Sequence, residues 1–212
     1  MKKPVPVIAI DGTAASGKGT MARRLATHLD YAYLDTGLLY RRVAYTLFEK
    51  GLPFEEADAA LQAARTLDAT KLDDPALRGP EAGRGSSIVA AMPTVRLALY
   101  DFQREFPAKS GKPGAILDGR DIGTVIFPEA ILKFYVDADQ AERARRRHKE
   151  LLGQGLDVFY EKVLEDMKIR DARDAGRPDA PMKAAPDAIH IDTTHMGPDE
   201  VFQEALKYIQ DR

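Results

Sequence analysis

Short apolar runs alternate along the chain with longer segments in which apolar residues recur every three or four positions. The short runs have the length of strands that are buried on both faces, and the longer segments have the period of amphipathic helices. This alternation favours βαβ units and a parallel sheet with helices on both faces. Five runs are predicted to form the strands, at residues 5–10, 31–34, 115–117, 132–136 and 188–191.

Seven segments of helical period lie between and after these strands, at residues 18–29, 38–50, 55–67, 94–106, 138–152, 158–172 and 198–209. Two stretches interrupt the pattern. Residues 68–87 are rich in Asp, Gly, Pro and Arg, and residues 176–187 contain three prolines. Clusters of Gly and Pro end helices and strands, so both stretches are predicted to be loops or lids. The first could equally be a plain surface connection.

Composition narrows the class of protein. The 212 residues are enough for one substantial core, with 44% hydrophobic and 30% charged residues, as in globular proteins. The apolar runs are too short to cross a membrane, and the first residues do not resemble a targeting segment. With a net charge of -2, the surface as a whole is not basic enough to indicate nucleic-acid binding. A chain without cysteine suits a reducing compartment. We expect one α/β domain over residues 1–212, a cytoplasmic monomer that binds neither membrane nor nucleic acid.

A glycine-rich run between the first predicted strand and helix carries the strongest chemical signal. Such a run turns backbone N–H groups toward phosphates, the helix N-terminus adds partial positive charge, and Lys18 reaches the β- and γ-phosphates of a nucleoside triphosphate. Gly19 stands where many such loops have Ser or Thr, so Thr20 or Ser16 is expected to supply the hydroxyl. The alternative is a flexible turn with a solvated lysine. The run consists of Gly12, Thr13, Ala14, Ala15, Ser16, Gly17, Lys18, Gly19 and Thr20.

The phosphoryl acceptor must be identified elsewhere, because this loop indicates only that a nucleoside triphosphate binds. Polar clusters follow the second and third predicted strands, at residues 34–42 and 117–124, and another lies between them at residues 87–96. Ligands of open parallel sheets bind at the carboxyl ends of the strands. These clusters are therefore predicted to form the acceptor site.

At these clusters the chain resembles the bacterial cytidylate kinase family. The run Asp-Gly-Arg-Asp-Ile-Gly-Thr-Val-Ile-Phe-Pro at residues 118–128 matches that family, as do residues 35–41, 87–96 and 170–177. The resemblance implies transfer of the γ-phosphoryl group of ATP to CMP or dCMP. It also implies a five-stranded P-loop kinase core with helices on both faces, formed by residues 1–50, 107–152 and 186–212. A short acceptor-side insertion would lie at about 51–106 and a lid at about 153–185.

The resemblance further implies two substrate sites. ATP would bind the glycine-rich run, Arg143, and Arg146 or Arg147 one turn further on. Mg²⁺ would enter with ATP and without a direct protein ligand, through a water held by Asp118. The residues implied in catalysis are Lys18, Asp118, Arg120, Arg170 and Arg177. CMP would bind Thr36, Tyr40, Arg41, Ser87, Arg96, Arg120, Asp121, Arg170, Asp174 and Arg177.

The chemistry of these side chains agrees with the implied roles. Arg41 and Arg120 carry guanidinium forks that suit a phosphate. A carboxylate at Asp121 would accept from the N4 amine of cytosine and would repel the oxygen of uracil at that place, which selects for CMP. Arg170, Arg173 and Arg177 follow helical spacing before a Pro-containing loop, and we expect them to swing together toward the phosphates.

Simpler explanations exist for several of these residues. Asp35 and Asp118 could be helix N-caps, Arg96 could be a solvated helix residue, and Tyr40 could pack in the core. The basic run at residues 143–149 could be a solvated helix face. Two other functions remain as alternatives to a kinase of CMP. One is a kinase for UMP, AMP or a carboxylated metabolite, and the other is a nucleotide-gated binding module that catalyses nothing.

Overall fold

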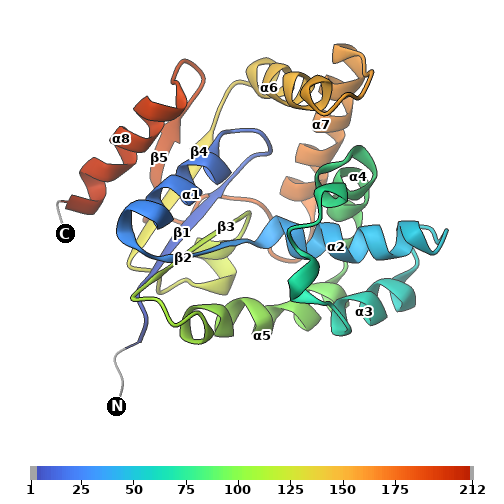
Figure 1. Ribbon diagram of the computed structural model, residues 1–212, viewed down its shortest axis with the longest axis horizontal. Coiled ribbons are helices and arrows are strands. Elements are labelled where there is room, and N and C mark those ends of the chain that lie inside the picture. The colour runs from blue at the N-terminus through green and yellow to red at the C-terminus, as the bar shows by residue number, and fades with distance from the viewer. Residues whose placement is uncertain (1–3, 211–212) are drawn as a thin grey trace.

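A five-stranded sheet forms the centre of the molecule (Figure 1). The structure, a computed structural model, describes residues 4–210, so residues 1–3 and 211–212 of the expected domain lie outside it. The strand order is β2-β3-β1-β4-β5, and every neighbouring pair is parallel. The five predicted strands are confirmed, as β1 (Val7–Gly12), β2 (Ala32–Asp35), β3 (Ala115–Gly119), β4 (Leu132–Asp137) and β5 (Ile189–Asp192).

Alternate residues of the central strand serve the two faces of the sheet. Ile8 and Ile10 of β1 belong to a core formed with α1 (Lys18–Leu29) and α8 (Pro198–Gln210). Val7 and Ala9 belong to the core on the other face, against α5 (Pro93–Lys109) and the single π-helical turn η3 (Ile122–Ile126). Both faces are apolar, which explains the continuous apolar run in the sequence. None of the helices between residues 4 and 210 is long and apolar enough to span a membrane.

Helices on one side of the sheet pack around an apolar cluster of their own. They are α2 (Thr36–Glu49), α3 (Ala57–Arg65), α4 (Pro80–Val89) and α5, which lie together beside the sheet in Figure 1. Leu39, Leu47 and Leu99 are fully buried in this cluster. The short turns η1 (Ala69–Lys71) and η2 (Pro75–Arg78) connect α3 to α4. Since α2 begins directly where β2 ends, this helical unit flanks the carboxyl edge of the sheet.

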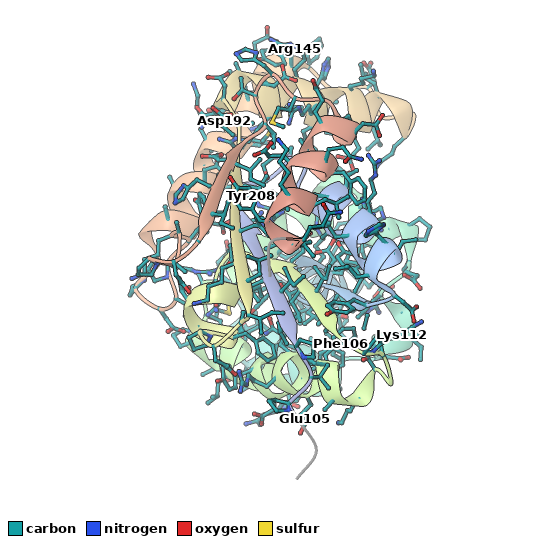
Figure 2. The ribbon with its side chains drawn as sticks, turned by 90° about the vertical axis from the view of Figure 1, so that its left-hand side faces the viewer. Glu105, Phe106, Lys112, Arg145, Asp192 and Tyr208 are labelled. Carbon is teal, nitrogen blue, oxygen red and sulfur yellow. The ribbon has the colours of Figure 1, made fainter. Side chains whose placement is uncertain are left out.

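Two further helices, α6 (Gln140–Gly153) and α7 (Tyr160–Gly176), pack against each other beyond the carboxyl ends of the strands. Arg145 on α6 and Glu105 on α5 lie at opposite ends of the molecule (Figure 2). The apolar contact between α6 and α7 also includes Ala14 and Ala15 of the glycine-rich run. The pair therefore lies over the edge of the sheet at which ligands of such folds bind.

The prediction that residues 68–87 form a loop is wrong for its last part, because α4 begins at Pro80. Pro is favourable at the first position of a helix. Gly85 weakens helix propensity, but it is needed where α4 crosses α2, since a Cβ there would lie 2.6 Å from the ring of Phe54 and 2.8 Å from the Cβ of Ala44. Packing thus outweighs propensity. The second predicted loop is confirmed, beginning after α7 ends at Gly176.

The close approach of α4 to α2 gives a stability prediction. We expect Gly85→Ala to lower the free energy of unfolding by about 1–3 kcal/mol, because the added methyl overfills a packed contact. The matched control is Gly153→Ala at the end of α6, where an added Cβ would meet no described heavy atom within 4 Å. Urea unfolding measures both changes. Equal midpoints for the two variants would contradict the close packing of α4 on α2.

Candidate active site

The glycine-rich run connects β1 to α1, as predicted, and side chains from the ends of neighbouring strands anchor it. The Thr13 hydroxyl donates to Asp137 at 2.5 Å, and the Thr193 hydroxyl donates to the backbone oxygen of Ser16 at 2.7 Å. The Ser16 hydroxyl is buried and donates to the backbone oxygen of Thr13 at 3.0 Å. Because Ser16 is engaged inside the loop, the geometry favours the exposed Thr20 as the hydroxyl that faces a ligand.

Gly19 departs from the usual loop pattern for a steric reason. A Cβ at this position would lie 3.0 Å from the Oδ2 atom of Asp118. That carboxylate accepts from the Tyr33 hydroxyl at 3.2 Å, and its Oδ1 atom lies 3.4 Å from Nζ of Lys18. A side chain at position 19 would crowd the carboxylate that pairs with the lysine. Asp118 lies inside β3, so its interpretation as a helix N-cap is wrong.

Burial and mutual attraction act in opposite directions on this ion pair. Burial lowers the pKa of Lys18, and the Asp118 carboxylate opposes the change. Burial likewise raises the pKa of Asp118, opposed by Lys18. A bound phosphate would add negative charge beside the ammonium group and would favour its charged form.

A cavity of about 570 Å³ opens beside the loop and could hold a nucleotide by its size. Loop residues 15–21 form one wall, and Arg146 and Thr193 form part of another. The Arg146 guanidinium donates to the backbone oxygen of Thr193 at 2.7 Å, which holds it at the cavity wall. Arg23 and Met196 also line the cavity, although the sequence analysis selected neither.

The three arginines predicted for the ATP side occupy different environments. Arg143 is buried under the loop, where it pairs with Asp171 at 2.7 Å and donates to the backbone oxygen of Ala14 at 3.4 Å. Arg147 lines a different cavity, between α4 and α7, and pairs with Glu150 at 2.8 Å. Of the pair left open by the sequence, Arg146 is the one at the ATP-side cavity. Arg143 supports the loop through its hydrogen bond to the backbone oxygen of Ala14.

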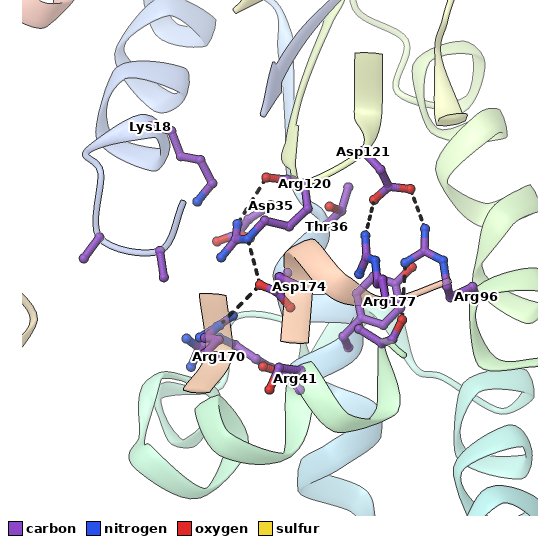
Figure 3. A pocket seen from close by; sticks show the side chains of 18 residues that line it. Lys18, Asp35, Thr36, Arg41, Arg96, Arg120, Asp121, Arg170, Asp174 and Arg177 are labelled. Carbon is purple, nitrogen blue, oxygen red and sulfur yellow. Dashed lines mark hydrogen bonds and ion pairs between the residues drawn. The ribbon is translucent and has the colours of Figure 1, made fainter. Parts of the chain in front are cut away.

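A second pocket adjoins the first and shares Ala15, Lys18 and Asp35 with it (Figure 3). All ten residues predicted to bind the acceptor line this pocket. Its walls carry six cations and three carboxylates, so the pocket as a whole favours an anion. The charged residues are Lys18, Arg41, Arg96, Arg120, Arg170, Arg177, Asp35, Asp121 and Asp174.

One end of the acceptor pocket concentrates positive charge next to Lys18. Arg120 donates to Asp174 at 3.1 Å, and Nε of Arg170 lies 3.8 Å from the same carboxylate. That Nε atom is buried without a hydrogen-bond partner among residues 4–210. Burial, with Arg170 and Arg147 nearby, lowers the pKa of Arg41 to about 9. Cations that repel one another in a buried site gain stability from a shared anion.

At the other end of the pocket, Asp121 lies between two arginines (Figure 3). Arg96 donates to one carboxylate oxygen, and Arg177 lies 3.3 Å from the other. Burial raises the pKa of Asp121, and both guanidinium groups oppose the change. Arg96 is only 6% exposed, so its interpretation as a solvated helix residue is wrong. Tyr40 packs in the core of the helical unit and also lines the pocket, its ring 5.8 Å from the Arg96 guanidinium.

The three lid arginines diverge, contrary to the expectation that they face the phosphates as one group. Arg170 lies at the end of the pocket near Arg120, and Arg177 lies at the opposite end with Asp121 (Figure 3). Arg173 donates to the Ser87 hydroxyl at 2.6 Å and so connects α7 to α4. One helix end thus reaches three parts of the site.

Several side chains that the fold brings to the site were not predicted from the sequence. Asp35 stands at the N-cap position of α2, but its side chain accepts no capping hydrogen bond there, and the residue lines both pockets. Asp179 belongs to the Pro-containing loop, and its Oδ2 atom lies 3.3 Å from Nε of Arg96. The position of Asp35 at the carboxyl end of a strand could have signalled its place, whereas the contact of Asp179 depends on tertiary structure.

Comparison with known proteins agrees with this geometry. A family model described as cytidylate kinase matches residues 8–211. A cytidylate kinase of Rhodospirillum rubrum is 52% identical over 202 residues, covering 94% of this chain and 95% of that protein. A cytidylate kinase of Xanthobacter autotrophicus is 52% identical over 206 residues, covering 97% and 98%. The crystal structure of an uncharacterized protein from Eubacterium ventriosum covers 99% of this chain and 100% of its own, with a TM-score of 0.54 at 17% identity, which shows a shared fold alone.

Proposed function

The chain belongs to the cytidylate kinase family and is an ATP-dependent kinase of CMP and dCMP, and we propose that the transfer takes place where its two pockets meet at Lys18. In this proposal ATP occupies the cavity beside the glycine-rich run and CMP occupies the cationic pocket. The division into core, acceptor-side insertion and lid stays a prediction, as do the monomeric state and the cytoplasmic location.

One observation carries the assignment of the acceptor pocket. Its cationic end adjoins Lys18, its far end holds a buried carboxylate between two arginines, and Asp174 lies between the ends (Figure 3). A nucleoside monophosphate has the same order of groups, with a phosphate, a sugar with hydroxyls and a polar base. The proposed orientation therefore brings the CMP phosphate next to the γ-phosphate of ATP.

At the phosphate end, the proposed catalytic contribution is electrostatic. The acceptor oxygen is already anionic, so the attack on the γ-phosphorus requires no general base. A bond forms from that oxygen to the γ-phosphorus as the bond to the β,γ-bridging oxygen breaks. Lys18, Arg120 and Arg170 would neutralise the charge on the transferred group, and their fixed positions favour an in-line arrangement.

The carboxylates near Lys18 fit Mg²⁺ bound with ATP. In kinase sites Mg²⁺ keeps several waters and uses one or two carboxylates together with substrate phosphates. Asp35 and Asp118 both line the ATP-side cavity. Asp118 would hold the ion through a water, and Asp35 lies close enough to share that role. The bound ion would neutralise charge on the β- and γ-phosphates.

At the base end, Asp121 is proposed to read the cytosine. A carboxylate has about four acceptor sites, so two arginines leave capacity for the N4 amine of the base. Arg96 and Arg177 fix the carboxylate and can donate to O2 or N3. Uracil has no donor at the position of N4, and its oxygen would face the carboxylate.

A panel of acceptors tests the proposed function. With ATP present, ADP formation should depend on CMP or dCMP and should be much slower with UMP, AMP or carboxylated metabolites. Turnover that prefers one of the other acceptors would refute the proposed base contact. ATP binding with no acceptor-dependent turnover would refute catalysis and favour a nucleotide-gated module.

The divergent lid arginines give two distinct kinetic predictions. We expect Arg170→Ala to lower kcat/KM by about 10³-fold while ATP affinity stays nearly unchanged, because its charge matters most when the transferred group carries charge. Arg177→Ala should instead act mainly on KM for CMP. The control is Arg145→Ala, at an exposed arginine of α6.

Steady-state kinetics and ATP titration of the same variants measure these effects. An equal loss of ATP affinity and turnover in Arg170→Ala would mean that Arg170 serves ground-state ATP binding. Variants that behave like the control would mean that both arginines merely form the charged end of a helix and contact neither substrate.

A further inference from the structure

A second buried aspartate lies close to the base-reading end of the pocket. Asp11 is the last residue but one of β1, 3% exposed, and sequence analysis assigned it no role. In the register of the sheet it pairs with Gly119, so its side chain lies next to the segment that leads to Asp121. Its Oδ1 atom accepts from the backbone N–H of Ile122 at 2.8 Å, and its Oδ2 atom accepts from that of Gly123 at 2.7 Å.

These two N–H groups are the first donors of η3, of which Asp121 is the N-cap residue. The backbone oxygen of Asp121 starts the turn, accepting from Val125 at 2.9 Å and from Ile126 at 3.2 Å. An aspartate at an N-cap normally uses its own carboxylate to accept from the second or third N–H of the helix. Here the Asp121 carboxylate points into the pocket toward two arginines instead.

We propose that Asp11 is a positioning residue for the acceptor base, capping η3 in place of Asp121 and so leaving the Asp121 carboxylate free to face the pocket. The inference rests on the proposed role of Asp121 in reading cytosine. It adds a reason why that carboxylate is available: the N–H of Gly123, one of the two donors that an N-cap carboxylate normally binds, is already bound by Asp11.

The physical consequence of losing Asp11 follows from the unsatisfied donors. Two buried N–H groups without an acceptor are costly, and Asp121, the N-cap residue that directly precedes them, carries a carboxylate that could replace Asp11. Turning toward its own helix, Asp121 would leave Arg96 and Arg177, and the N4 amine would lose its acceptor. The loss should fall on recognition of cytosine rather than on ATP, although Asp11 directly precedes the glycine-rich run.

A double-mutant cycle tests this coupling through the ratio of kcat/KM for CMP to that for UMP. We expect Asp11→Ala to lower the ratio about tenfold, the size of a lost helix cap, mainly through KM for CMP and with KM for ATP nearly unchanged. Asp11→Asn, which keeps one acceptor and the same shape, should lower it less and carries the test if the alanine variant does not fold. In an Asp121→Ala background, either change should leave the ratio where Asp121→Ala alone puts it.

The matched control is Asp139→Ala, which removes a carboxylate that also accepts from two N–H groups at a helix start, at 2.9 and 3.1 Å, but on α6. It should leave the ratio at the wild-type value. If both folded Asp11 variants lower stability and keep the wild-type ratio, Asp11 is merely structural and the inference is overturned. A further fall of the ratio in the Asp121→Ala background also overturns it. If Asp121→Ala alone keeps the wild-type ratio, the proposed reading of the base fails, and the inference fails with it.

Discussion

Lys18→Ala should lower CMP-dependent turnover by roughly 10³ to 10⁵-fold while the chain stays folded. Lys18 is the cation shared by the two pockets, and its Nζ atom lies 3.4 Å from Asp118. Burial lowers its pKa, so the protein already bears the cost of holding an ammonium group in this place. The Asp118 carboxylate offsets part of that cost, and a bound phosphate would offset more of it.

Coupled detection of ADP measures the loss, and thermal unfolding checks the fold. Lys109→Ala is the control, since that lysine is exposed on α5 and pairs with Glu105. A folded Lys18→Ala variant with near-normal turnover would contradict the assignment of the glycine-rich run as the phosphate-binding loop.

Asp121→Ala should remove most of the preference for CMP over UMP, and mainly by damaging the reaction with CMP. A site built around a buried hydrogen-bonding group discriminates by about 10⁴-fold or more, far beyond what shape alone achieves. The alanine variant also leaves the buried Arg96 and Arg177 without their carboxylate, which lowers stability as well.

Asp121→Asn separates these two effects. The amide keeps the shape of the side chain, and its NH₂ group can donate to the uracil oxygen, so the use of UMP should rise as the use of CMP falls. Competition between CMP and UMP in one assay measures the preference directly. If folded variants keep the full wild-type preference, Asp121 does not read the base, and Ser87 or Arg96 becomes the first candidate.

The sequence was sufficient for the parts of this protein that depend on local pattern. Buried strands show as apolar runs, and the glycine-rich run has a fixed relation to its strand and helix. Of the ten residues predicted to bind the acceptor, those that directly follow β2 and β3 lie close together because strand ends in a parallel sheet meet at one edge. Family resemblance supplied their identity, since spacing alone left simpler explanations for Arg96 and Tyr40.

Features that depend on tertiary contact could not be predicted. Helix α4 contains glycines that indicate a loop, yet Gly85 is the residue that permits its packing on α2. Strand β1 extends past the apolar run to Asp11 and Gly12, which pair with β3 and β4, and the buried Asp11 carboxylate finds its donors in a distant segment. Helical spacing likewise could not show that Arg170 and Arg177 reach opposite ends of the pocket.

A crystal structure of the chain with CMP bound tests the orientation of the acceptor most directly. The proposed site predicts the N4 amine of cytosine within about 3.2 Å of a carboxylate oxygen of Asp121. It also predicts the CMP phosphate among Arg41, Arg120 and Arg170. A base whose N4 amine contacts other groups, or a phosphate at the Asp121 end of the pocket, would contradict it.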